Sequence, residues 1–300
     1  MSHPLRSTSI LLLIASVALF GLTTEAVCAQ NIQDLLDTTA DRKGVIFAPG
    51  VISSPDSSES SPSITADGST LVFTRYANYG QQVPYIATRI GHSEHDDAWD
   101  VQRAPFAEFV YNLAISPDGQ TILYRPPRRG NSASKPTSRV FRVQKQPGGK
   151  WSDAEEIEEL RKTRAGYFDL QEDGTLYLYA RPGESDADPN KPRGVYRTHL
   201  NVDGSTEPLT FVGLHVSPSG SNTFDPDVFR NGRQMIVTRA GISAEEEETL
   251  GRKGFYLHRR SSDGWTKGQR LKLPYGWGAT ILPDSRMLYV HDGDLYVVSL

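Results

Sequence analysis

Short strand-like stretches of apolar residues alternate with polar turns along most of the chain, and one unit of this pattern occurs five times. In each unit a partly apolar strand enters an Asp-Gly, Asn-Gly or related turn, and a second strand rich in aliphatic and aromatic residues follows. Such a unit predicts a β-hairpin, because these turn residues tolerate backbone conformations that most others avoid. The five stretches are SPSITADGSTLVFTR from Ser61, NLAISPDGQTILYR from Asn112, YFDLQEDGTLYLYAR from Tyr167, DPDVFRNGRQMIVTR from Asp225 and GATILPDSRMLYVH from Gly278.

One residue at the tip of each turn, here called the hairpin residue, marks the period of the repeat. Successive hairpin residues are 51, 55, 58 and 53 positions apart. A near-constant period of this length is typical of the four-stranded blades of a β-propeller. The hairpin residues are Asp67, Asp118, Asp173, Asn231 and Asp284.

Each repeat continues into two further strands, and the last repeat is incomplete. Residues 84–88 and 99–101 supply the third and fourth strands of the first unit, and the next three units follow the same order. The fifth unit stops after a third strand at residues 294–298, which leaves an edge for another strand to cover. Residues 45–48 are the one strand-like segment not yet assigned. We therefore predict an all-β fold, a single five-bladed propeller of four-stranded antiparallel blades, in which this N-terminal strand completes the C-terminal blade.

A few segments depart from the strand pattern. Ser243 and Glu246 have the spacing of a helix-capping box, which predicts a short helix up to Leu250 between the second and third strands of blade 4. Residues 152–155 have the same spacing and fit either a helix or an irregular outer strand. Residues 30–44 and the Ser-rich run 53–63 are expected to be loosely packed.

The N-terminus has the pattern of an export signal. A basic start with Arg6 precedes an apolar run at residues 10–22, and small residues before Gln30 offer a cleavage site after Ala29. We therefore predict a signal peptide at 1–29, a linker at 30–44 and the propeller at 45–300, with no membrane span in the mature chain. Cleavage there would also remove Cys28, the only cysteine, unless Cys28 carries a lipid anchor instead.

Composition adds little about function. Apolar residues make up 37% of the chain, and its 26 glycines and 19 prolines suit short strands joined by many turns. The net charge of −4 gives no reason to expect a nucleic-acid partner.

The elements SPSITADG and AISPDG and the endings FTR, LYR, YAR and VTR resemble the WD40-like (PD40) propeller repeat. That repeat is found in TolB, the periplasmic component of the Tol-Pal system, and in many secreted bacterial proteins. GVYRTHLNVDGSTEPL and FYLHRRSSDGWTKGQRL are similar to the second half of the same repeat. The resemblance covers residues 45–300 and implies the propeller fold and an exported location, whereas function varies widely among such propellers.

Alignment on the hairpin residue gathers candidate binding residues at the opposite end of the blades. There the loops that enter the inner strands and those that join second to third strands open on one face, at the channel mouth. Arginine offers forked donors to carboxylate, sulfate or phosphate groups, and aromatic rings stack on sugars. The same arginines also fit a purely structural role, in which each pairs with an Asp or Glu of the neighbouring blade. The candidates are Arg75, Arg125, Arg181, Arg239 and His291 after the second strands, and Tyr111, Tyr167, Phe224, Asp225 and Trp277 before the turns.

Acidic residues at the same end suggest an alternative. Asp169 and Asp225, with Glu59 and Asp227 nearby, offer carboxyls for the acid and base of a glycoside hydrolase or lyase. Aspartates at such positions also bind neighbouring backbone amides. A polar loop at residues 92–97 fits either a divalent metal or plain solvation, and we expect no metal and no cofactor because no recurring ligand spacing or cofactor motif is found.

Two function classes therefore remain. The first is an exported, non-catalytic binding or scaffold protein, periplasmic or secreted, which recognises a small anionic ligand or saccharide, or an envelope protein, at the Arg and aromatic mouth. The second is a carbohydrate-active enzyme that uses the acids at the mouth.

Overall fold

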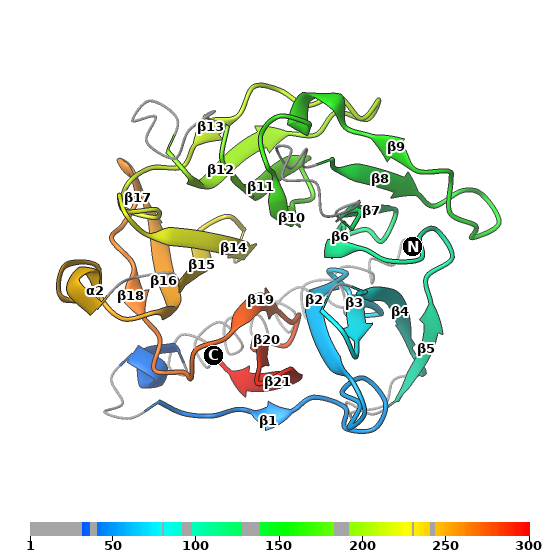
Figure 1. The fold of residues 1–300 in the computed structure, drawn as a ribbon, viewed down its shortest axis with the longest axis horizontal. Coiled ribbons are helices and arrows are strands. Elements are labelled where there is room, and N and C mark those ends of the chain that lie inside the picture. Colours follow the sequence, from blue (N-terminus) through cyan, green and yellow to red (C-terminus); the bar gives the residue numbers. More distant parts are fainter. Residues whose placement is uncertain are drawn as a thin grey trace, which may run out of the picture.

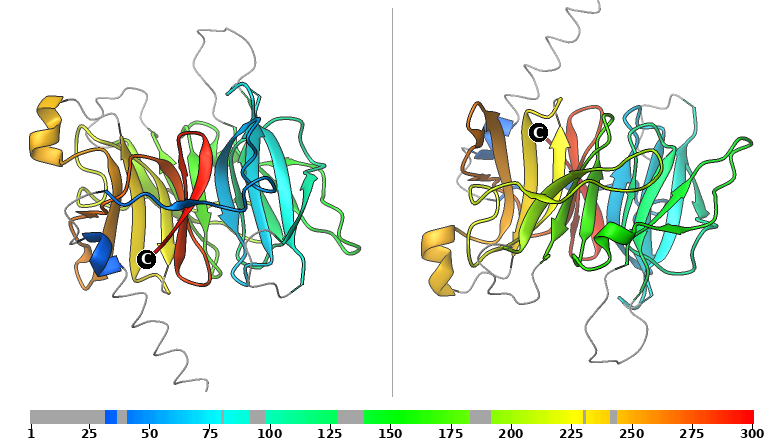
Figure 2. Two further views of the ribbon diagram at one scale, coloured as in Figure 1. Left: turned by 90° about the horizontal axis from the view of Figure 1, so that it is seen from below. Right: turned by 90° about the horizontal axis from the view of Figure 1, so that it is seen from above.

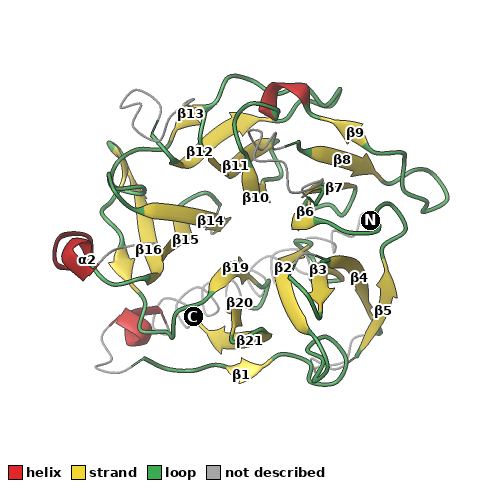
Figure 3. Cartoon of the chain, in the orientation of Figure 1, coloured by secondary structure: helices red, strands yellow, loops and turns green. Residues whose placement is uncertain are grey.

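The computed structural model describes residues 32–36, 41–79, 81–91, 98–127, 139–182, 192–229, 231–240 and 244–300. Five antiparallel sheets stand around a central channel (Figure 1). This confirms the prediction of an all-β, five-bladed propeller. Helix is confined to short pieces at the periphery of the described chain (Figure 3). The predicted signal peptide lies outside the described residues.

The strands of each blade follow one another from the channel to the rim. Blade 1 contains β2 (Ser58–Ile64), β3 (Thr70–Tyr76), β4 (Val83–Arg89) and β5 (Trp99–Arg103); blade 2 contains β6 (Tyr111–Ile115), β7 (Thr121–Arg125), β8 (Phe141–Gln144) and β9 (Glu155–Glu156). Blade 3 contains β10 (Gly166–Leu170), β11 (Thr175–Ala180), β12 (Gly194–His199) and β13 (Thr210–Phe211). Blade 4 contains β14 (Asn222–Phe229), β15 (Gln234–Ala240) and β16 (Gly254–Ser261), with the short β17 (Gly264–Trp265) and β18 (Gln269–Arg270) both pairing with β16; blade 5 contains β19 (Trp277–Ile281), β20 (Arg286–His291) and β21 (Asp294–Ser299).

The N-terminal strand closes the ring as predicted. Strand β1 (Val45–Ile46) pairs antiparallel with β21, with Val45 opposite Val297, and lies outermost in blade 5 (Figure 1). The next residue, Phe47, is buried and makes an edge contact with Trp99 of blade 1, with ring centroids 6.2 Å apart. The closing segment therefore joins the last blade to the first by backbone pairing and by side-chain packing.

The core is divided among the blade interfaces. The buried apolar residues of the described chain form five clusters, and each cluster draws mainly on two neighbouring blades. Blades are therefore buried on both faces, which agrees with second strands that read as nearly continuous apolar runs. Figure 2 shows these sheets from the side, standing edge-on around the channel.

Two segments expected to be loosely packed are ordered instead. Residues 32–36 form a short helix whose Ile32 and Leu35 are buried in the cluster between blades 4 and 5. The second half of the Ser-rich run belongs to the inner strand β2, which pairs with β3. The helix α2 (Ala244–Leu250) is confirmed, and residues 155–156 form an outer strand.

No helix among the described residues is long and apolar enough to cross a membrane.

The closing strand offers a test of the fold. A β-carbon on Gly44 would collide with the backbone carbonyl of Val297 in β21. We expect Gly44→Ala to lower the free energy of unfolding by about 1–3 kcal/mol, the usual cost of forcing extra atoms into a packed site. Val45→Ala, at an exposed neighbour, is the control and should change it by less than about 0.5 kcal/mol. Denaturant unfolding measures both, and equal stability of the two variants would contradict the closure.

Candidate functional site

The innermost strand of every blade has the same irregularity at the same place. The residue six positions before each hairpin residue has a positive φ angle, between 49° and 63°. The pairing register with the second strand shifts at that point in all five blades. This is the geometry of a β-bulge, which bends a strand and redirects its side chains. The five residues are Ser61, Asn112, Tyr167, Asp225 and Gly278.

Two positions after the bulge, polar side chains tie neighbouring blades together. An inner strand pairs on one side only, so its other edge presents unpaired backbone groups to the channel. The Ser63 hydroxyl of blade 1 accepts a hydrogen bond from the amide of Ile115 in blade 2 (3.1 Å). The Thr280 hydroxyl of blade 5 donates to the carbonyl oxygen of Pro62 in blade 1 (2.8 Å). These contacts give hydrogen-bond partners to some of the unpaired backbone groups on the free edges of the inner strands.

Aspartates occupy the same position in blades 3 and 4. The Asp169 carboxylate accepts a hydrogen bond from the amide of Val228 in blade 4 (2.8 Å). The Asp227 carboxylate accepts one from the amide of Ile281 in blade 5 (3.3 Å). Both acids are thus bound to the inner strand of the next blade.

Blade 2 is the exception in this ring. Its residue at the equivalent position is Ala114, which has no polar atom. The amide of Leu170 in blade 3 therefore has no side-chain acceptor from blade 2, although its counterparts in blades 2, 4 and 5 have one. The connection between blades 2 and 3 rests on apolar packing near the channel.

Burial makes the channel acids hard to ionise. Asp225, itself a bulge residue, is 8% exposed and accepts a hydrogen bond from the Gly278 amide of blade 5 (2.7 Å). Burial raises the pKa of Asp225 and that of Asp227 to about 7. The pKa of Asp169 is raised well above its ordinary value by burial and then by the charge of Asp227. Asp169 and Asp227 are therefore electrostatically coupled neighbours.

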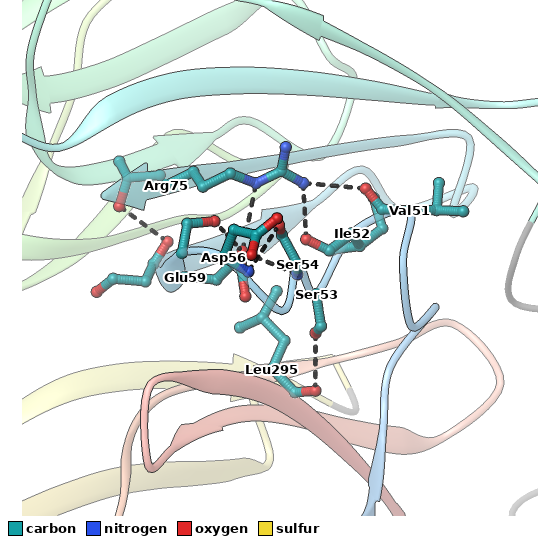
Figure 4. A network of polar contacts seen from close by, with 11 residues as sticks. Val51, Ile52, Ser53, Ser54, Asp56, Glu59, Arg75 and Leu295 are labelled. Atoms are coloured by element: carbon teal, nitrogen blue, oxygen red, sulfur yellow. Dashed lines mark hydrogen bonds and ion pairs between the residues drawn. The ribbon is translucent and has the colours of Figure 1, made fainter. Parts of the chain in front are cut away.

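The five predicted cationic positions differ in what they contact. Arg75 donates through Nε to Oε1 of the fully buried Glu59 (3.3 Å) and through Nη2 to the carbonyl oxygens of Val51 and Ile52 (2.9 and 2.8 Å; Figure 4). Burial raises the pKa of Glu59 to about 7 despite this partner. Arg75 thus fastens the segment after β1 to blade 1.

The side chains of Arg239 and His291 are also hydrogen-bonded within the chain. Arg239 is 4% exposed, donates through Nη1 to the carbonyl oxygen of Leu250 at the end of α2 (2.9 Å), and lies 3.8 Å from the ring centre of Tyr256. His291 is hydrogen-bonded through Nδ1 to the carbonyl oxygen of Tyr275 (2.9 Å). Both side chains hold loops of blades 4 and 5 in place.

Arg125 and Arg181 lie among further arginines at the mouth. Burial raises the pKa of Tyr179 in β11, and the charges of Arg181, Arg193, Arg164 and Arg125 oppose this rise. The charges of four arginines therefore act on one tyrosine of blade 3. The pKa of Arg181 is lowered by burial and by the charges of Arg164 and Arg193, as expected where cations crowd together.

Aromatic rings gather beside these arginines. Tyr167 lies 4.9 Å from Phe224 of the next blade and 6.1 Å from Tyr179, measured between ring centroids. Tyr111 lies 6.0 Å from Tyr79 and donates its hydroxyl hydrogen to the Tyr79 carbonyl oxygen (3.2 Å). The predicted aromatic residues of blades 2, 3 and 4 thus line one side of the opening.

Two polar contacts link the remaining predicted residues to the inner strands. Trp277 donates through its indole Nε1 to Ser60 Oγ of blade 1 (3.4 Å). Arg125 donates through Nη1 to Oδ1 of the bulge residue Asn112 (3.4 Å). We name the basic and aromatic part of this end the arginine mouth: Arg125, Arg164, Arg181, Arg193, Tyr167, Tyr179 and Phe224.

Sequence reasoning missed Arg164, Arg193 and Tyr179. Arg164 lies in the loop that enters β10, and Arg193 ends the loop before β12. Both loop classes were expected at this face, so a count of basic residues in those loops would have found them.

A cavity lies at the other end of the channel. It has a volume of about 620 Å³ and is lined by residues of all five hairpins, together with Asp169 and Asp227. A much smaller space of about 40 Å³, surrounded by bulge residues and Asp225, lies in the channel between the two ends. The hairpin aspartates themselves cap their turns, as in the Asp67 carboxylate, which accepts the amide hydrogen of Ser69 (2.9 Å).

No group of three or more metal-ligating side chains occurs within the described part of the chain. The polar loop at 92–97, which the sequence offered as a metal candidate, lies outside the described residues.

Comparisons with known proteins support the fold and leave function open. No family model matches the chain, and no curated protein sequence matches it significantly. Among solved structures, an α-L-arabinofuranosidase from Lactobacillus brevis is 11% identical, with 82% of this chain and 91% of that chain covered and a TM-score of 0.52. A gluconolactonase from Xanthomonas campestris is 13% identical (88% and 96% covered, TM-score 0.49), and a putative TolB from Agrobacterium tumefaciens is 14% identical (79% and 71% covered, TM-score 0.47). At 11% identity the likeness to the arabinofuranosidase shows the fold alone.

The buried acids predict an unusual pH dependence of stability. Asp225, Asp227 and Glu59 have folded-state pKa values near 7, above the unfolded value of about 4. The folded protein therefore holds more protons between these limits, and its free energy of unfolding should fall as the pH rises from about 4 to 7. Asp225→Asn removes one of the groups that hold the extra protons. The free energy of unfolding should then change less steeply with pH, by about 1.4 kcal/mol per pH unit. Urea unfolding across this range measures the slope.

Asp263→Asn, on an exposed hairpin of blade 4, is the control and should leave the slope unchanged. A free energy of unfolding that rises steadily from pH 4 to 7 would show that these carboxyls are ionised in the folded protein.

Proposed function

We propose that the chain is an exported, non-catalytic propeller that binds a small anionic ligand at the arginine mouth. The observation that carries this proposal is that the charges of Arg125, Arg164, Arg181 and Arg193 all act on Tyr179. Like charges repel one another, and an anion bound near these arginines would lower that repulsion. Arginine forks fit carboxylate, sulfate and phosphate groups in particular.

The neighbouring rings favour a ligand with a flat face. Tyr167 and Phe224 meet across the interface of blades 3 and 4. Phe224 is only 8% exposed, so the partly exposed ring of Tyr167 is the one that suits the apolar face of a sugar or an aromatic ring. An acidic saccharide or an aromatic carboxylate combines both features. An envelope protein that presents an acidic side chain is the other occupant that this surface fits.

A carbohydrate-active enzyme is less well supported by the geometry. General acid and base catalysis needs carboxyls that can reach the substrate and exchange protons with it. Asp225 and Asp169, the predicted pair, each accept a backbone amide of the next blade. Both oxygens of Asp169 also accept hydrogen bonds from the Gln171 side chain (2.9 and 2.8 Å). These contacts favour a role in holding the blades together.

Export is part of the proposal and rests on the N-terminal sequence pattern. Cleavage after Ala29 and release into the periplasm or the medium would follow from a basic start, an apolar run and small residues before the cut. N-terminal sequencing of the protein secreted by a bacterial host tests it. A mature chain that still begins at Met1 would contradict export.

Binding at the arginine mouth is tested with defined anions. Glucuronate, galacturonate, benzoate and sulfate are titrated in a thermal-shift assay, where a ligand at about 100 times its dissociation constant adds about 2.7 kcal/mol. We expect at least one organic anion to bind, and Arg164→Ala with Arg193→Ala to weaken it at least tenfold. Arg233→Ala, on the exposed hairpin of blade 4, is the control and should bind as the unmodified protein does.

Equal affinity in the double variant would place the anion elsewhere. If none of the four anions binds, the small-ligand proposal is wrong, and capture of a partner from an envelope extract, compared between the unmodified protein and the double variant, tests the protein alternative.

A further inference from the structure

The cavity at the hairpin end of the channel is built from the same repeat positions in every blade. The residue three positions before each hairpin residue lines it, and all five of these residues are aliphatic. Three are buried and two are partly buried. They form an apolar collar around a space of about 620 Å³, which is large enough for a small organic molecule. The collar is Ile64, Ile115, Leu170, Val228 and Ile281.

The charged residues that line this cavity are all acidic. Asp169 and Asp227 lie toward the channel, and Glu172 and Asp173 lie in the hairpin of blade 3. No Lys, Arg or His is among the described lining residues. The two ends of the channel thus differ in sign, because arginines gather at the mouth and carboxyls gather here.

One carboxyl oxygen of Asp227 can accept a hydrogen bond from a ligand. Its Oδ2 accepts the Ile281 amide at the long distance of 3.3 Å. No described residue donates a hydrogen bond to its Oδ1. Its neighbour Asp169 is already bonded at both oxygens, so it contributes negative charge rather than a free acceptor. A buried carboxylate without a cationic partner is costly, and a bound cation would remove that cost.

An apolar collar above a carboxylate pair selects the kind of cation. A bare metal ion needs several oxygen ligands and gains nothing from aliphatic walls. An ammonium or guanidinium group on a short hydrocarbon chain uses both features, because its N–H donors meet the carboxyl and its chain lies against the collar.

We propose that the hairpin cavity is a second binding site, specific for a small organic cation, namely a primary amine or a guanidine on a short aliphatic chain. Its charged group lies at Asp227 beside Asp169, and its chain packs against Ile115, Leu170 and Ile281. This site does not depend on the proposed anion binding at the arginine mouth, from which the channel separates it.

Binding should become tighter as the pH rises, because the cation needs an ionised carboxyl. The pKa of Asp227 is raised to about 7. The titratable groups around it are Asp169 and Tyr177 of blade 3, Glu172 and Asp173 of its hairpin, and Asp225 of its own strand. All are acidic or neutral, so none competes as a cation. Below pH 7 the affinity should rise by up to about tenfold per pH unit.

Isothermal titration calorimetry on the full mature protein tests the proposal with pentylamine and agmatine as probes and 1-pentanol as the neutral analogue. We expect both cations to bind at pH 8, at least tenfold more weakly at pH 6, and far more tightly than 1-pentanol. At pH 6 the reaction should release protons, which titrations in two buffers of different ionisation enthalpy would detect.

The variant Asp227→Asn keeps a carbonyl oxygen for the Ile281 amide and loses the charge. It should weaken amine binding at least tenfold, whereas Asp263→Asn and the Arg164→Ala, Arg193→Ala double variant should not affect it. No binding of either cation, equal binding of 1-pentanol, or unaltered affinity in Asp227→Asn would each overturn the proposal. If Asp227→Asn fails to fold, the pH dependence and proton release of the unmodified protein decide the matter.

Discussion

The structure depends on how the innermost strand of each blade deals with its unpaired edge. A strand next to the channel pairs with its own blade on one side only, and its other backbone groups need partners. The chain meets this need with a bulge in every inner strand and, two residues later in every blade except blade 2, a polar side chain that bonds to the next blade. The contacts of the channel acids follow from this arrangement.

This constraint explains why acids in a propeller channel need not be catalytic. Asp169, Asp225 and Asp227 each accept an amide of the following blade, and burial keeps their protons bound to higher pH than usual. The two ends of the channel nevertheless differ in charge. One end gathers arginines around Tyr179, and the other combines carboxyls with an aliphatic collar. Binding of oppositely charged molecules at the two ends is the function that this layout favours.

Much of the fold could be predicted from the sequence because the repeat fixes it locally. The hairpin turns define the period, and the missing fourth strand of the last blade pointed directly to Val45 as the start of the closing segment. Individual contacts could not be predicted in the same way. Arg75 and Arg239 share a repeat position, yet one binds Glu59 and the other the end of α2, because the loops around them differ in each blade. Asp169 and Asp227 were expected at the mouth, whereas the bulge turns them toward the hairpin end.

Amide hydrogen exchange, followed by NMR, most directly tests the hydrogen bonds between the inner strands of neighbouring blades. Ile115, Val228 and Ile281 occupy one repeat position, and each amide is bonded to a side chain of the preceding blade. Leu170 occupies the same position behind Ala114, which cannot bond to it. The account predicts that the Leu170 amide exchanges about tenfold faster than the other three, as expected for the loss of one hydrogen bond. Equal exchange of all four amides would contradict it.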